Sequence, residues 1–125
     1  QQDASGGFLA FIPLAFHPLN TELASLPGTT GFDDLKTLAI ARLMLDNIPH
    51  IKAFWIMVGL KVAQLATVFG VDDIDGTVVE EKITHMAGAS TPEALSKAEL
   101  VRLIAETGHV PVERDTLYNV VKIHD

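Results

Sequence analysis

Long apolar runs alternate with helix-like patterns along the first part of the chain, and this alternation is the strongest signal in the sequence. Two runs lie near residues 8–16 and 51–58, and a shorter one surrounds Ile74, near residues 72–76. A strand that is covered on both faces shows a continuous apolar run, because neither face meets water. We therefore predict three buried parallel strands, each followed by a helix, in a βα, βα, βα series.

Helix-capping signals follow the same order. In a capping box, two side chains three residues apart satisfy the orphan backbone amides at the start of a helix. Three pairs have this spacing: Thr30 with Asp33, Thr77 with Glu80, and Ser96 with Glu99. The predicted helices cover residues 32–46, 60–69, 77–88 and 96–107, and Gly70 is placed to close the second in a left-handed conformation.

The helix over residues 32–46 is predicted to be amphipathic. Its apolar positions keep a helical period and comprise Phe32, Leu35, Leu38, Ala39, Leu43 and Met44. The predicted solvent-facing side holds Asp34, Lys36, Thr37, Arg42 and Asp46. In the tail we predict a short extended piece at residues 110–112 and a final helical turn over residues 115–121.

The composition is that of one folded domain. The chain has 125 residues, of which 48% are hydrophobic and 20% are charged. A formal net charge of -7 and the lack of a basic stripe argue against nucleic-acid binding, which depends on clustered Lys and Arg. The absence of cysteine excludes disulfides, zinc-thiolate sites and any iron-sulfur cluster held by this segment alone. We expect a cytoplasmic location.

No segment of the sequence is predicted to enter a membrane. The longest stretch without Asp, Glu, Lys or Arg runs from Ala4 to Thr21, but its apolar part, Phe8 to Phe16, is too short to span a bilayer. It also lacks the basic lead-in of a signal peptide. Because the first residue is Gln1 rather than Met, we expect that residues upstream are missing.

A sheet of three parallel strands would leave hydrophobic edges exposed. Parallel sheets bury both faces and normally need more strands to do so. Exposing the large side chains Phe11, Phe54, Trp55 and Ile56 would cost about 1.5 to 3 kcal/mol each, which a small domain cannot offset. The chain is therefore expected to belong to a larger barrel or to associate with itself.

Several motifs in order resemble one family over nearly the whole chain. They are residues 8–21, 31–47 (GFDDLKTLAIARLMLDN), 52–59, 72–81 (DDIDGTVVEE), 85–89 and 112–118 (VERDTLY). Together these motifs resemble the carboxyl-terminal part of the aminofutalosine synthases, radical S-adenosylmethionine enzymes of the futalosine route to menaquinone. The third strand, Asp72 to Thr77, favours this family over the related cyclase and deazaflavin synthase, whose strand reads Asn-Asp followed by Gly-Gly or Phe-Gly.

The resemblance implies an α/β fold, a partial (β/α) TIM-like barrel made of the last three βα units plus carboxyl-terminal helices. It also implies that the full-length enzyme uses S-adenosylmethionine and a four-iron four-sulfur cluster. The three-cysteine cluster motif of the family is absent here. The chain is thus interpreted as a fragment, inactive alone and with neither group bound, whose partner is the missing amino-terminal part or a second copy.

The implied reaction adds a 5'-deoxyadenosyl radical to the enol ether of 3-[(1-carboxyvinyl)oxy]benzoate and yields 6-amino-6-deoxyfutalosine. A different class remains open: a noncatalytic α/β module that self-associates through its open sheet edges. A cysteine-bearing amino-terminal portion in the complete reading frame would favour the enzyme. A stable product that starts near Gln1 would favour the module.

In a barrel, ligand contacts come from the carboxyl ends of the strands. The candidates are therefore His17, Asn20 and Thr21 after the first strand, Met57 and Gly59 after the second, and Asp75, Gly76 and Thr77 after the third. No catalytic residue is assigned, and no metal site is predicted.

Each candidate has a structural alternative. His17 would donate to a substrate carboxylate or serve as a structural hydrogen-bonder, and Asp75 would hold a ribose hydroxyl or amino group or cap its own turn. Arg114 would pair with a substrate carboxylate or anchor the tail, and the anchor is favoured. The remaining candidates are favoured as structural: Thr77 and Glu80 as a helix cap, Phe54 and Trp55 as core, Glu81 as a solvated helix start and His85 as a surface or packing residue.

Overall fold

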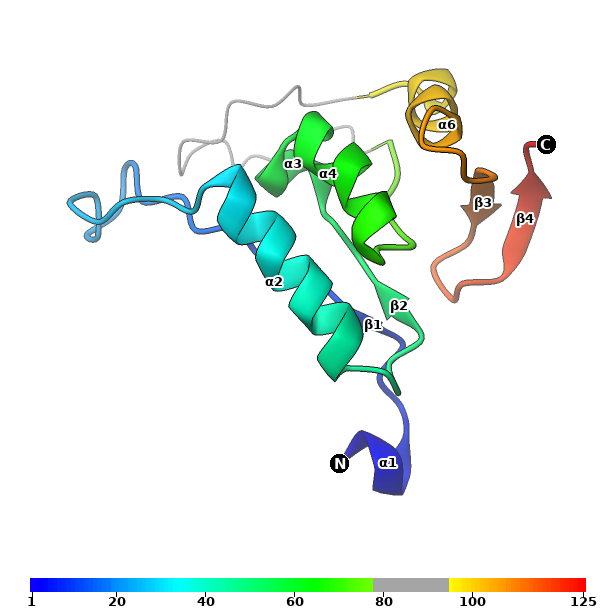
Figure 1. Ribbon diagram of the computed structural model, residues 1–125, viewed down its shortest axis with the longest axis horizontal. Coiled ribbons are helices and arrows are strands. Elements are labelled where there is room, and N and C mark those ends of the chain that lie inside the picture. Colours follow the sequence, from blue (N-terminus) through cyan, green and yellow to red (C-terminus); the bar gives the residue numbers. More distant parts are fainter. Residues whose placement is uncertain (78–94) are drawn as a thin grey trace.

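The computed structural model describes residues 1–77 and 95–125. Short strands and helices alternate along these two stretches (Figure 1). The elements are α1 (Gln2–Ser5), β1 (Ala10–Phe11), α2 (Gly31–Met44), β2 (His50–Ile51), α3 (Trp55–Val58), α4 (Leu60–Ala66), the 3-10 helix η1 (Thr67–Phe69), α6 (Lys97–Ala105), β3 (Val112–Arg114) and β4 (Val120–Ile123). The helix predicted over residues 77–88, with Glu80, Glu81 and His85, lies outside the described residues.

The predicted parallel strand order is confirmed, although the strands are short. β1 pairs in parallel with β2, so that Ala10 is opposite His50 and Phe11 is opposite Ile51. A single parallel bridge then joins Lys52 to Asp73. Regular pairing therefore covers only a small part of the predicted stretches 8–16, 51–58 and 72–76. The described residues show an α/β arrangement built on small sheets.

The second predicted strand is wrong at its carboxyl end. Pairing stops at Ala53, whose N–H donates to the Asp73 carbonyl at 2.9 Å. The chain then turns into α3, where the Gly59 amide donates to the Trp55 carbonyl at 2.8 Å. An apolar run is typical of a buried strand and of a buried helix alike, so its periodicity could not locate this change.

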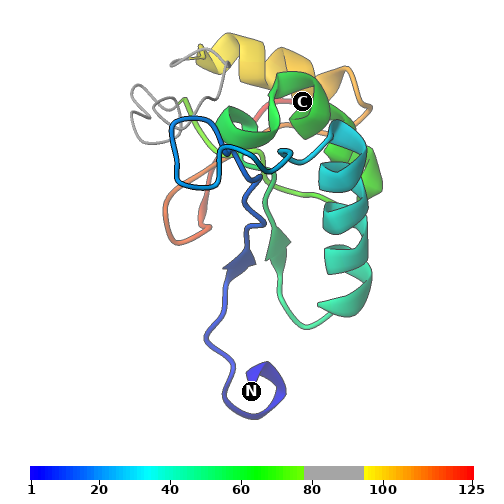
Figure 2. The ribbon, with the colours of Figure 1, turned by 90° about the vertical axis from the view of Figure 1, so that its left-hand side faces the viewer.

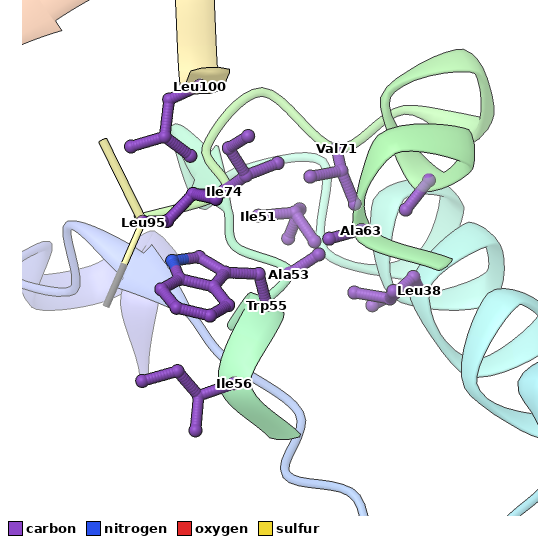
Figure 3. Close-up of a cluster of buried hydrophobic side chains, with 12 residues drawn as sticks. Leu38, Ile51, Ala53, Trp55, Ile56, Ala63, Val71, Ile74, Leu95 and Leu100 are labelled. Carbon is purple, nitrogen blue, oxygen red and sulfur yellow. The ribbon is translucent and has the colours of Figure 1, made fainter. Parts of the chain in front are cut away.

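The hydrophobic core lies between the strands and the helices α2 and α4. Successive side chains of a strand point to opposite faces, and Ile51 and Ala53, at alternate positions, are both fully buried. They pack with Leu38 of α2 and Ala63 of α4 (Figure 3). Trp55, the first residue of α3, is also fully buried, and its indole points away from Leu38 (Figure 3). The indole Nε1 of Trp55 donates to the Gly76 carbonyl at 2.9 Å, so this aromatic residue has the predicted role in the core.

The amino-terminal caps of α2 and α6 are confirmed. The amide of Asp33 donates to Thr30 Oγ1 at 3.1 Å, and the amide of Thr30 donates back to the Asp33 carboxylate at 3.0 Å. Ser96 and Glu99 repeat the arrangement at α6. Gly70 also closes η1 as predicted, with φ 96°, and a Cβ there would lie 2.6 Å from Arg42 Cγ.

The predicted faces of α2 are only partly right. Leu38 is fully buried, but Phe32 and Leu43 are 75% and 79% exposed. Arg42, predicted on the solvent-facing side, instead donates to the Gly70 carbonyl at 2.7 Å and to Asp72 Oδ1 at 2.8 Å. The helix therefore buries a narrow stripe and leaves much of its apolar surface uncovered among the described residues.

The final helical turn predicted over residues 115–121 is wrong. β3 and β4 form an antiparallel hairpin in which Val112 is opposite Ile123. The Asp115 carboxylate shapes the turn by accepting the amides of Leu117 and Asn119 at 2.8 and 2.9 Å. The β-branched residues that follow favour an extended strand over a helix, and the hairpin satisfies them.

The hairpin and helix α2 lie on opposite sides of the parallel strands. Figure 1 shows α2 and the hairpin on either side of β2, and the turned view in Figure 2 shows the same order. Alternation along β2 explains it, because Ile51 faces the helices while His50 and Lys52 face the other way. In the part of the chain that the structure describes, no helix has the length and apolar character needed to cross a bilayer.

We expect Leu38→Ala to destabilise the protein by about 2–5 kcal/mol, because it opens a cavity in the packed core. The matched control is Leu43→Ala on the exposed side of the same helix, for which we expect a change of about 0.5 kcal/mol or less. Urea unfolding measures both free energies. Equal losses at the two positions would contradict this account of the core.

Candidate functional site

Six of the eight predicted strand-end residues fall into two groups, each of which lines one cavity. His17, Met57 and Gly59 line a cavity of about 220 Å³ near the starts of α2 and α4. Asp75, Gly76 and Thr77 line a second cavity of about 470 Å³, which α6 and the hairpin also border. Asn20 and Thr21 lie in an exposed loop, where the Thr21 hydroxyl donates to the Pro18 carbonyl at 2.6 Å.

In the first cavity, His17 is held by the backbone that follows the second strand. Its Nε2 lies 2.9 Å from the Met57 carbonyl oxygen, and the ring is half-buried. Asp34, at the start of α2, lines the same cavity and was not predicted as a site residue. Burial raises the pKa of Asp34, and this effect outweighs the hydrogen bond from Thr29 and the charge of His17.

A cluster of opposite charges lies where the second cavity meets a third one of about 410 Å³, since Asp75 and Arg114 line both. The Asp73 carboxylate, only 6% exposed, accepts a short hydrogen bond from Arg114 Nε through its Oδ2. Asp75 Oδ1 lies 3.4 Å from Lys52 Nζ and 3.8 Å from Arg114 Nη2. Two carboxylates and two cations from three separate segments therefore meet at the end of the third strand. The prediction that Arg114 anchors the tail is confirmed.

Asp75 has a strained backbone at this point. Its φ is 72°, a left-handed value that costs an ordinary residue about 1–2 kcal/mol. The Asp73 side chain stabilises it, because Asp73 Oδ1 accepts the Asp75 amide at 2.7 Å. The turn is thus capped by Asp73, and the carboxylate of Asp75 is left to face the two cations.

Electrostatics favours the charged form of Asp73. Burial raises its pKa, but hydrogen bonds from Arg114 and from the Asp75 amide, with the charges of Arg114 and Lys52, more than offset this effect. The pKa of Asp73 is therefore lowered from its ordinary value of 3.8. Below the cluster, Tyr118 stacks on His50 with ring centroids 3.8 Å apart, and burial together with the Asp73 charge raises the pKa of Tyr118 to about 12.

Three members of this cluster were missed as site residues: Lys52, Asp73 and, as part of the cavity, Arg114. One signal was present, since Lys52 is the single charged residue of an apolar run. A charge that enters a buried strand normally needs a partner, and Asp73 and Asp75 are the nearest carboxylates in the following strand. Among the described residues no three His, Asp or Glu side chains are grouped to hold a metal ion.

We expect Asp73→Asn to destabilise the protein by about 1–3 kcal/mol at neutral pH, because it removes a charged hydrogen-bond acceptor from Arg114. A lowered pKa contributes stability above the unfolded value, and this contribution is lost as the pH falls through the folded value. The difference from the wild type should therefore shrink as the pH falls below 3.8. Unfolding free energies measured from pH 7 to pH 2 test this, with Glu22→Gln as an exposed control.

Comparison with known proteins identifies the family. Residues 5–125 match the CofH/MqnC C-terminal region. Aminodeoxyfutalosine synthase of Thermus thermophilus is 52% identical over 99% of this chain and 34% of its own length. Cyclic dehypoxanthine futalosine synthase of Streptomyces coelicolor is 39% identical over 99% of this chain and 31% of its own length.

A third relative acts on another substrate. The 5-amino-6-(D-ribitylamino)uracil–L-tyrosine 4-hydroxyphenyl transferase of Methanothermobacter thermautotrophicus is 42% identical over 97% of this chain and 34% of its own length. The chain thus spans about a third of the length of these curated relatives. The resemblance to aminofutalosine synthases is confirmed, and the matched family is named for a carboxyl-terminal region. This chain belongs to the CofH/MqnC C-terminal region family.

Proposed function

We propose that this chain is the carboxyl-terminal part of a radical S-adenosylmethionine enzyme that makes 6-amino-6-deoxyfutalosine. The reaction cleaves S-adenosylmethionine, releases methionine, and joins the 5'-deoxyadenosyl group to the enol ether of 3-[(1-carboxyvinyl)oxy]benzoate. Rearrangement and loss of the enol-ether carboxylate then give the product. The observation that carries the proposal is the 52% identity to the Thermus thermophilus aminodeoxyfutalosine synthase. Two relatives named for other activities, the Streptomyces coelicolor cyclic dehypoxanthine futalosine synthase and the Archaeoglobus fulgidus 4-hydroxyphenyl transferase, are 39% and 44% identical.

The residues present do not fit a four-iron four-sulfur cluster, because the chain has no cysteine thiolate to ligate one. We therefore assign no step of the reaction to a cluster held here. In the proposed enzyme the cluster belongs to the amino-terminal part. S-adenosylmethionine, when bound, supplies the adenosyl group, and the residues of this chain bind and orient the reactants and keep water away.

We assign a different ligand to each of the two cavities. Asp75, which faces Lys52 and Arg114, would accept hydrogen bonds from the ribose hydroxyls of S-adenosylmethionine, and Gly76 and Thr77 line the same cavity. His17, which lines the other cavity with Met57 and Gly59, would bind a carboxylate of the benzoate substrate. Asp34 lines the same cavity, and burial raises its pKa.

The partner that completes the fold is proposed to be the amino-terminal part of the same enzyme, closing a (β/α) barrel around these strands. Large apolar side chains are exposed beside β1 and along α2: Phe8, Leu9, Ile12, Leu14, Phe32, Ile40, Leu43 and Met44. A neighbouring strand and helix would cover both surfaces at once. Self-association through the same surfaces is the other arrangement that would cover them.

The activity is tested in a chimera in which this chain replaces the matching region of the Thermus thermophilus enzyme. We expect the chimera to form 6-amino-6-deoxyfutalosine from the two substrates, measured by mass spectrometry, with the unmodified Thermus enzyme as control. The products of the other relatives are assayed in parallel. A folded chimera that makes only a product of another relative, or none, would contradict the proposal.

The ligand contact is tested by Asp75→Asn in the same chimera. Removing the charged acceptor is expected to raise the KM for S-adenosylmethionine about tenfold or more, because a charged hydrogen bond contributes about 1.5–3 kcal/mol. The control is Asp46→Asn, an exposed carboxylate after α2, for which we expect an unchanged KM. An unchanged KM in Asp75→Asn would rule out this contact.

A further inference from the structure

Arg114 of the hairpin contacts two carboxylates at the carboxyl end of the third strand, Asp73 and Asp75. Arg114 lies at the end of β3, and its Nε donates to Asp73 Oδ2 across 41 positions of sequence. Its Nη1 donates to the Asp115 carbonyl at 2.9 Å, and its Nη2 lies 3.8 Å from Asp75 Oδ1. The guanidinium therefore contacts three groups at once, each through a different nitrogen.

The Asp73 carboxylate links Arg114 to Asp75, because it accepts hydrogen bonds from both. One of its oxygens accepts from Arg114, and the other accepts the Asp75 amide at 2.7 Å. The orientation of Asp73 is thus set on one side by Arg114, and on the other side it holds Asp75 at a φ of 72°. Without Arg114, the Asp73 carboxylate is free to rotate, and the strained backbone of Asp75 is free to relax.

Arg114 is itself held in place by its own hairpin. Its guanidinium lies 4.2 Å from the ring centroid of Tyr118, and Tyr118 stacks on His50 of β2 with an interplanar angle of 9°. A cation over an aromatic face is attracted by the ring quadrupole. The side chain is therefore positioned from both ends, by the aromatic stack and by the two carboxylates.

We propose that Arg114 is a positioning residue, which acts through Asp73 to fix the ligand-binding carboxylate of Asp75. This inference rests on the proposed function, because it takes Asp75 as the group that contacts S-adenosylmethionine. It makes the hairpin a part of the binding site. The alternative role for Arg114 is only to fasten the hairpin to the rest of the molecule.

The structure offers a matched control for that alternative. In the turn of the hairpin, Asn119 Nδ2 donates to the Asp115 carboxylate at 2.8 Å, and Asn119 lines neither of the cavities beside Asp75. Its substitution loosens the hairpin and leaves the contacts of Asp73 and Asp75 in place. Arg114→Lys is a second informative change, because one ammonium cannot reproduce a planar guanidinium that contacts three groups through separate nitrogens.

The experiment uses the active chimera and measures kcat, the KM for S-adenosylmethionine and the Tm of each variant. Arg114→Met is expected to raise the KM about tenfold, the range of one charged hydrogen bond, with kcat changed less than about threefold. Arg114→Lys is expected to recover part of this loss at most. Asn119→Ala is expected to lower the Tm while the KM stays at the wild-type value.

A double mutant separates this inference from the proposed function. If Arg114 acts through Asp75, Arg114→Met should add little to the KM of Asp75→Asn, because both changes remove the same contact. Equal fold-changes in the two backgrounds would overturn the positioning role, as would an Arg114→Met variant that loses Tm but keeps its KM. An unchanged KM in Asp75→Asn with a raised KM in Arg114→Met would instead overturn the assignment of Asp75.

Discussion

The alternation of side chains along residues 50–53 is the constraint on which the rest of the structure depends. Ile51 and Ala53 are fully buried and pack with residues of α2 and α4. His50 and Lys52 must then point to the other face of the sheet, since neighbouring residues of a strand cannot share a face. That face receives the hairpin, with Tyr118 on His50 and Arg114 among the carboxylates. One short strand therefore separates a buried apolar face, which supplies stability, from a charged face, which holds the cluster of Lys52, Asp73, Asp75 and Arg114.

Local signals in the sequence predicted the local features well. The caps at Thr30 and Ser96 and the left-handed Gly70 are decided by a few neighbouring atoms, and all three are present. The length of each element and its pairing with distant segments were not predictable from such local signals. Residues 55–58 are apolar in either a strand or a helix, and the hairpin over residues 112–123 depends on pairing that no single window of sequence displays.

In the candidate site, too, positions along a strand were predictable and contacts between distant segments were not. Strand-end position alone predicted Asp75 and His17, because the topology of a parallel α/β fold brings those ends to one edge. The partners of Asp75 were not predictable from spacing, since Arg114 reaches Asp73 and Asp75 from a distant segment. Lys52 was the one visible hint, a charge inside an apolar run. A buried cation of this kind is a reason to search the next strand for its carboxylate.

The hydrophobic core and the hairpin each contain one intrinsic spectroscopic reporter. The chain has a single tryptophan, Trp55, in the core, and a single tyrosine, Tyr118, in the hairpin. The indole emission reports the polarity around the packed interior, whereas the phenol absorbance reports its contact with His50 and Arg114. Undocking of the hairpin and melting of the interior are therefore distinguishable in the unmodified protein, without an added dye or label.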